Sequence, residues 1–122
     1  MLYYQEMMHA LEYEQNRVSI LVNDNDHTSG ILSVPERCKR TAVILAHGAG
    51  NDMNTPLLAS FADSLATAGY PVLLFNFLYK ERGKKAPDSW DILTKTWAAA
   101  FLYAKETLNG KVDVWVAAGK SM

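Results

Sequence analysis

The sequence is poor in cysteine, in long apolar runs and in net charge, and each shortage excludes a class of protein. The single cysteine, Cys38, cannot form an internal disulfide and leaves no thiolate cluster for a structural zinc ion. The longest apolar runs, residues 42–46 and 97–104, are far shorter than the roughly 20 residues of a membrane-spanning helix. Twelve Lys and Arg against thirteen Asp and Glu give a formal charge of −1, without the basic character typical of nucleic-acid binding. We therefore expect neither a nucleic-acid nor a membrane partner.

The composition is that of a folded chain with a hydrophobic core. Hydrophobic residues make up 49% of the sequence and charged residues 20%. At 122 residues the chain has room for one domain at most. The N-terminus lacks the basic and long apolar regions of a secretory signal, so we expect a cytoplasmic location.

Short β-prone runs alternate with helical patterns along the chain. Residues 1–16 mix acidic and apolar side chains, and we interpret them as an appendage to a domain over residues 17–122. Two β-prone runs separated by the turn formers of residues 23–27 predict an antiparallel hairpin with a five-residue connection. Further strands are predicted where apolar residues follow one another almost without interruption, as in strands buried on both faces of a parallel sheet. The predicted strands cover residues 18–22, 28–34, 41–46, 71–75 and 113–118.

Two helices are predicted between the buried strands. Thr55 as N-cap, Pro56 at the first position and Gly69 after the end frame the first helix. The second begins at a cap on Asp88 or Ser89 and ends at 109–110, after a loop over 76–87. Their expected apolar positions are Leu57, Phe61 and Leu65 in the first helix, and Leu93, Trp97, Phe101, Ala104 and Leu108 in the second, with Trp90 as a further core residue. This order predicts an α/β fold, a mostly parallel doubly wound sheet with an N-terminal antiparallel hairpin, and a domain that is incomplete at residue 122.

Phosphate and metal sites fit the sequence poorly. Residues 48–50 follow a strand, but Met53 stands where a dinucleotide loop needs its third glycine. Residues 119–121 resemble the end of a phosphate loop, yet Val114 stands where that loop needs its first glycine. The histidines are too far apart for a paired metal site; they are His9, His27 and His47. We expect no metal and no organic cofactor.

Two turns after strands fit acyl-transfer chemistry. Gly119-Lys120-Ser121-Met122 supplies the first four positions of the nucleophile elbow G-x-S-x-G, directly after a strand. Small residues there permit the tight turn that presents the serine hydroxyl as a nucleophile. The other turn, His47-Gly48-Ala49-Gly50, follows an earlier strand, where such enzymes place a backbone N–H that faces the oxyanion. Ser121 is thus the candidate nucleophile, and the N–H groups of Ala49 and Met122 are the candidate oxyanion donors.

These turns, with Phe75-Asn76-Phe77, resemble the α/β-hydrolase superfamily in its dienelactone-hydrolase-like branch. The resemblance covers residues 17–122, as the N-terminal half of such a domain that ends at the nucleophile elbow. It implies a serine-dependent hydrolase acting on an ester or related acyl bond of a small molecule, with the triad acid and histidine beyond Met122. One departure is Leu78, where members of the branch often carry proline. The alternative is a non-catalytic scaffold of the same fold.

Several residues near these turns have a structural interpretation beside the functional one. His47 precedes the place of a triad histidine in the chain order, so we interpret it as a loop-structuring residue. Gly48 and Gly50 permit a turn with positive φ, which is compatible with an oxyanion role. Phe77 and Tyr79 either line an acyl pocket or pack the loop.

Charged residues and the last strand complete the predictions. Asp52 is interpreted as a cap or turn residue, and the basic run Lys80-Glu81-Arg82-Gly83-Lys84-Lys85 as a solvated loop rather than a device that steers anions. The apolar strand 113–118 would leave an unpaired sheet edge, which invites self-association.

Overall fold

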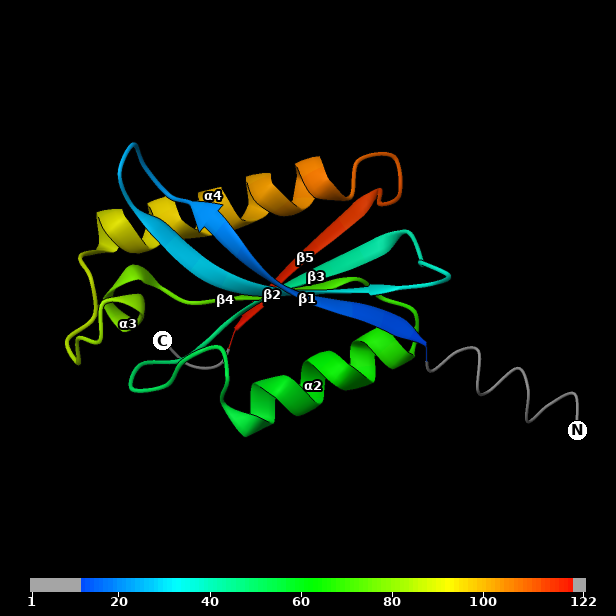
Figure 1. Cartoon of the computed structure of the whole chain (residues 1–122), viewed down its shortest axis with the longest axis horizontal. Helices are drawn as coiled ribbons and strands as arrows, with labels where there is room; N and C mark the ends of the chain where they lie inside the picture. The colour runs from blue at the N-terminus through cyan, green and yellow to red at the C-terminus, as the bar shows by residue number, and fades with distance from the viewer. Residues whose placement is uncertain (1–11, 120–122) are drawn as a thin grey trace, which may run out of the picture.

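The computed structural model of the chain describes residues 12–119 as a sheet between helices (Figure 1). The strands are β1 (Tyr13–Leu21), β2 (His27–Pro35), β3 (Thr41–Ala46), β4 (Val72–Phe75) and β5 (Val114–Gly119). The helices are α2 (Pro56–Thr67), α3 (Leu78–Glu81) and α4 (Trp90–Thr107). The short helix α3 lies inside the region predicted as a loop.

The sheet has five strands in the order β1-β2-β4-β3-β5. The hairpin β1–β2 is antiparallel, as predicted, and β2 also runs antiparallel to β4. β3 pairs in parallel with both β4 and β5. Helix α2 covers one face of the sheet and α4 the other (Figure 1). The predicted α/β class is confirmed, with a mixed sheet that joins an antiparallel hairpin to parallel strands.

β3 contributes side chains to both hydrophobic layers, which explains its unbroken apolar sequence. Ala42, Ile44 and Ala46 belong to the cluster under α4. Val43 and Leu45 belong to the cluster under α2. Because successive side chains of a strand point to opposite faces, a strand covered on both sides needs apolar residues at every position.

β1 begins at Tyr13, four residues before the domain boundary expected at residue 17. Its first half pairs with the end of β2, from Tyr13 opposite Pro35 to Arg17 opposite Ile31. The polar residues 14–17 are exposed, and they gave no strand signal in the sequence. Because β1 is an edge strand, its backbone can pair while its polar side chains remain in water.

The apolar face predicted for α2 is wrong by one position at Leu57 and Phe61, whereas Leu65 is half-buried and packs against the core as predicted. Leu57 and Phe61 are 57% and 50% exposed, whereas Leu58, Ala62 and Ala66 face the sheet. Alanines on the inner face let the helix lie close to the strands, so the larger side chains are left at the side. Thr55 is the N-cap residue, as predicted, but its hydroxyl donates to the Asp52 carbonyl instead of accepting from the helix.

Helix α4 follows its predicted pattern more closely, with two exceptions. Leu93, Ala104 and Leu108 are buried, and the Phe75 and Trp97 rings pack at 5.2 Å. Phe101 is 38% exposed and Trp90 is 79% exposed, so the prediction of both as core residues is wrong. Trp90 occupies the first helical position after the N-cap Ser89, at the N-terminal end of the helix.

β5 lies at the edge of the sheet among the described residues, as predicted for the apolar strand 113–118, but its side chains are more exposed than those of a buried strand. Val114 and Val116 are 53% and 41% exposed. Within residues 12–119, β5 pairs only with β3, so its outer edge is free of strand partners. In the same range of residues, no helix is both long enough and apolar enough to cross a membrane.

Candidate active site

The candidate site forms where the parallel strands β4, β3 and β5 end. Ala46, the last residue of β3, lies opposite both Phe75 of β4 and Gly119 of β5. The segments that follow these strands therefore leave the sheet side by side, at the carboxyl ends of the strands. Open α/β sheets bind their ligands at this end, beyond the carboxyl ends of the parallel strands.

Gly119 allows β5 to approach β3 closely at this edge. A Cβ atom on Gly119 would lie 3.3 Å from the Ala46 carbonyl oxygen and 3.5 Å from the Ala46 Cβ. The predicted supporting role of this glycine thus has a physical basis in the contact with Ala46. The predicted nucleophile Ser121 and the predicted oxyanion donor Met122 lie outside the described residues.

His47 is fully buried and joins the segment after β3 to the segment after β4. Its Nε2 atom accepts a hydrogen bond from the Phe77 N–H at 3.0 Å. Its Nδ1 atom lies 2.9 Å from the Gly48 carbonyl oxygen. Burial lowers the pKa of His47 below its ordinary value of 6.5. These contacts agree with the loop-structuring role predicted for this residue.

The turn after His47 presents Ala49 to solvent. Gly50 has a φ of 82°, a backbone conformation that favours glycine, whereas Gly48 is not among the described glycines with positive φ. The Asn51 N–H donates to the Gly48 carbonyl at 3.1 Å and closes the turn. Ala49 is exposed, and among residues 12–119 its N–H has no hydrogen-bond acceptor. The described residues thus leave this N–H without a competing acceptor, which is a condition of the predicted oxyanion role.

Phe77 and Tyr79 pack the loop after β4 instead of lining an open surface. Their exposed fractions are 0% and 1%. The two rings stack at 6.5 Å, and the edge of the His47 ring meets the Phe77 ring at 5.0 Å. Of the two roles considered from the sequence, the described residues show the packing role.

Asn76 is a site residue to which the sequence gave no role. Its Oδ1 accepts from the buried Met53 N–H at 2.8 Å, and its Nδ2 donates to Glu81 at 3.1 Å. The backbone carbonyl of Asn76 accepts from the Thr28 hydroxyl at 2.6 Å. The sequence feature that could have indicated this role is a polar amide between two aromatic residues at the end of a buried strand. Such an amide must find hydrogen-bond partners within the fold.

Glu81 continues this network toward β2. It accepts a hydrogen bond from the Ser29 hydroxyl at 2.6 Å as well as the one from Asn76. Partial burial raises the pKa of the Glu81 carboxyl, but the hydrogen bonds from Ser29 and Asn76 outweigh that effect and leave the pKa lowered. The carboxylate therefore stays charged and keeps both donors in place.

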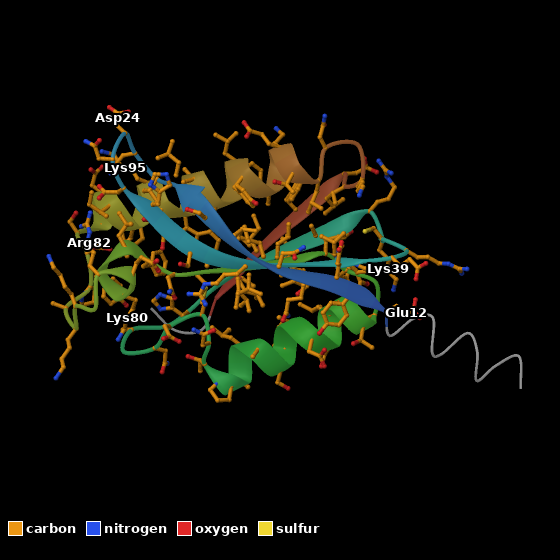
Figure 2. All side chains as sticks on the ribbon, in the orientation of Figure 1. Glu12, Asp24, Lys39, Lys80, Arg82 and Lys95 are labelled. Atoms are coloured by element: carbon orange, nitrogen blue, oxygen red, sulfur yellow. The ribbon has the colours of Figure 1, made fainter. Side chains whose placement is uncertain are left out.

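The remaining charged candidates act as surface and turn residues. Arg82 forms an ion pair with Asp26 of the hairpin turn, and Figure 2 shows Arg82 and Lys80 on the α3 side of the molecule. Residues 81–87 are exposed, in keeping with a solvated loop. Asp52 accepts from the Asn54 N–H at 2.8 Å, as a turn residue does. Among the described residues, no three His, Cys, Asp or Glu side chains are grouped to hold a metal ion.

Solved structures share this fold at low sequence identity. The Pyrococcus furiosus esterase Pf2001 gives a TM-score of 0.73 at 24% identity, over 89% of this chain and 41% of the esterase. A dienelactone hydrolase from Anabaena variabilis gives 0.70 at 21% identity, over 86% of this chain and 51% of the hydrolase. Brefeldin A esterase, a bacterial homologue of human hormone-sensitive lipase, gives 0.70 at 18% identity, over 88% and 31%. The chain thus spans about half or less of the length of these proteins.

Sequence comparison gives the family. No curated protein sequence matches the chain significantly. A family model described as an alpha/beta hydrolase domain matches residues 39–122, which include both predicted turns. This match covers more than half of the chain and confirms the family predicted from those turns. The chain belongs to the alpha/beta hydrolase domain family.

Proposed function

We propose that this chain is the nucleophile-bearing part of a serine hydrolase that acts on an ester or related acyl bond of a small molecule. The observation that supports this most directly is the pairing of Ala46 with Gly119. It brings the end of β5, two residues before Ser121, beside the turn that exposes the Ala49 N–H. The nucleophile and the oxyanion donor must contact the same acyl group, one at its carbon and the other at its oxygen, so they have to lie close together.

In the proposed reaction, the Ser121 Oγ bonds to the acyl carbon and the carbonyl electron pair moves onto oxygen. The N–H groups of Ala49 and Met122 donate to this oxyanion. A histidine base takes the hydroxyl proton and passes it to the leaving group as that bond breaks. Water then attacks the acyl-enzyme by the same steps and releases the acid, so no metal or cofactor takes part.

The base in this proposal is a histidine other than His47. Both ring nitrogens of His47 are engaged, by the Phe77 N–H and the Gly48 carbonyl, and its side chain is 0% exposed. His27 lies at the start of β2, in the hairpin, and His9 lies outside the described residues. We therefore place the triad acid and histidine after Met122, in the order that this family follows.

The proposed setting is the cytoplasm, where a free thiol is stable. Cys38 is in no disulfide, and its Sγ atom lies 3.1 Å from the Pro35 carbonyl oxygen. A small acyl compound is the proposed substrate.

The test is covalent labelling of a complete hydrolase domain that contains this chain. A serine-directed fluorophosphonate probe should label the protein, and Ser121→Ala should abolish the label. Ser64→Ala is the matched control, because Ser64 is an exposed serine in the last turn of α2, outside the segments that form the site. Undiminished labelling of the Ser121 variant would refute the assignment, and a complete domain that is never labelled would support the scaffold alternative.

A further inference from the structure

The protonation state of His47 is determined by its two hydrogen-bond partners. The Gly48 carbonyl only accepts hydrogen bonds, so the Nδ1 atom 2.9 Å away must carry a hydrogen. The Phe77 N–H only donates, so the Nε2 atom 3.0 Å away must present a lone pair. The buried ring is therefore the neutral Nδ1–H tautomer.

The bond to Gly48 also fixes the direction of the next N–H. The Gly48 C=O and the Ala49 N–H belong to one planar trans peptide and point in opposite directions. The carbonyl points toward the buried ring, where His47 and the Asn51 N–H both donate to it. The Ala49 N–H consequently points away from these groups, and Ala49 is exposed.

The turn itself supplies one restraint on this peptide, the hydrogen bond from the Asn51 N–H to the Gly48 carbonyl at 3.1 Å. Glycine stands on one side of the peptide, at position 48, and glycine backbones have the widest range of accessible conformations. A second partner outside the turn therefore adds to the restraint on the orientation of the peptide. The His47 ring, immobilised against Phe77 and Tyr79, is such a partner.

We propose that His47 is a positioning residue whose neutral tautomer holds the Gly48–Ala49 peptide with its N–H toward the oxyanion site, and whose protonation releases that peptide. This inference rests on the proposed function, because it assigns to the oxyanion donor a control by histidine protonation. His47 acts through the backbone and touches neither substrate nor nucleophile.

Protonation would disrupt the arrangement at Nε2. The imidazolium carries hydrogens on both nitrogens, so Nε2–H and the Phe77 N–H would become two donors facing each other at 3.0 Å. The ring would have to move, and its bond to the Gly48 carbonyl would move with it. The loss of this bond releases the peptide from the ring and leaves it the hydrogen bond from the Asn51 N–H, so the Ala49 N–H can take a wider range of orientations than with both bonds in place.

The surroundings of the ring keep it neutral at neutral pH. Burial lowers the pKa of His47; the bond to Gly48 and the negative charge of Asp52 oppose this effect, and the positive charge of Lys80 on α3 adds to it. The other titratable side chain against the ring is the buried phenol of Tyr79. The peptide is thus held at neutral pH and released in acid.

Two substitutions separate the two ends of the ring. In His47→Asn the side-chain amide takes the place of Nδ1–H and can still donate to the Gly48 carbonyl. In His47→Gln the amide oxygen takes the place of Nε2 and can accept from Phe77, but the donor to Gly48 is lost. Both variants remove the ring from the core, and Asn leaves the larger cavity, so a merely structural role predicts an effect of His47→Asn at least as large as that of His47→Gln.

Nuclear magnetic resonance on a complete hydrolase domain that contains this chain provides the test. We expect the Nδ1–H tautomer at neutral pH, and an Ala49 amide shift that changes with the same midpoint as the His47 ring. His47→Asn should retain the Ala49 amide signal of the original chain and His47→Gln should lose it, while His27→Gln, at an exposed histidine, should leave it unchanged. In a complete domain, His47→Gln should lower kcat roughly a hundredfold with little change in KM, as the loss of one oxyanion donor does.

The inference is overturned by an Nε2–H tautomer, by an Ala49 amide that does not follow the ring titration, or by an effect of His47→Asn at least as large as that of His47→Gln. If neither variant folds, the tautomer and titration of the unsubstituted chain decide. None of these spectroscopic readouts involves Ser121, so they remain decisive whether or not the serine is labelled by the probe.

Discussion

Replacing Asn76 with alanine should loosen the far end of the loop that carries the oxyanion donor. The Asn76 side chain is 7% exposed and accepts from the Met53 N–H, whose residue is 0% exposed. Alanine cannot replace this acceptor. The Met53 N–H would then be buried without a partner, because Met53 itself is fully buried.

The expected destabilisation follows from the groups left unpaired. A buried backbone donor without an acceptor costs about 1–3 kcal/mol. The lost bond to Glu81 adds less, because that carboxylate is exposed and water can replace the amide. We therefore expect the free energy of unfolding to fall by about 2–3 kcal/mol in Asn76→Ala.

Urea unfolding followed by tryptophan fluorescence measures this change. Trp97 packs on Phe75, the residue before Asn76, and so reports on the affected region. Asn54→Ala is the control, because Asn54 is exposed in the same loop and should change stability by less than about 0.5 kcal/mol. A loss in Asn76→Ala as small as the control's, with an unchanged m value, would refute the reasoning.

The isosteric variant Asn76→Asp adds a test of the electrostatics. One carboxylate oxygen can still accept from Met53, but the other would face Glu81, whose Oε2 lies 3.1 Å from the replaced amide nitrogen. The pKa of this carboxylate pair should be raised in the folded state, since the two like charges repel. The variant should therefore regain stability relative to the original chain as the pH falls through the raised pKa, and a deficit that does not depend on pH would contradict this.

Three further variants test the site and the sheet edge. Gly119→Val places side-chain atoms against Ala46 and should lower stability by about 1–3 kcal/mol in urea unfolding. In a complete domain, Gly48→Val should misplace the Ala49 N–H and lower turnover roughly a hundredfold; full turnover would count against the oxyanion role. The isolated chain should self-associate in light scattering, and Val116→Lys on β5 should reduce this while Leu21→Lys on the opposite edge strand should not; a monomeric chain at all concentrations would show that the edge is not adhesive.

The order of the elements could be predicted because each buried strand carries its own signal. An apolar run such as residues 41–46 has few alternatives once turn formers bound it. The hairpin was equally accessible, since its connection is rich in Asn and Asp. The start of β1 was not accessible, because residues 14–17 are polar and take their conformation from pairing with β2.

The orientation of elements was harder to predict than their existence. In α2, two stripes with a spacing of four residues compete, and the larger side chains of Leu57 and Phe61 favoured the wrong one. Helix-to-sheet distance decides between such stripes, and sequence spacing does not contain that distance. For the same reason the composition of β5 indicates a strand that can be buried, but its position in the sheet decides whether it is.

The site could be predicted in part. Ala49 and the loop role of His47 were predicted from the turn after β3, and the structure shows an exposed Ala49 there and a buried His47 ring with a hydrogen-bond partner at each nitrogen. The role of Asn76 did not follow, because its partner Met53 is 23 positions away in the sequence. A hydrogen bond between two loops depends on the strand register that brings them together, and that register is a property of the fold.

The geometry of the oxyanion loop therefore depends on the pairing of β3 with β4. His47 holds the loop at its start and Asn76 holds it at Met53, and the partner of His47 is again in the segment after β4. Both restraints exist because Ala46 and Phe75 end their strands at the same level. A slip of one residue in this register would turn the apolar side chains of β4 to the opposite layers and separate both pairs. The two hydrophobic layers that fix the register thus also fix the direction of the Ala49 N–H, which links the stability of the sheet centre to the competence of the site.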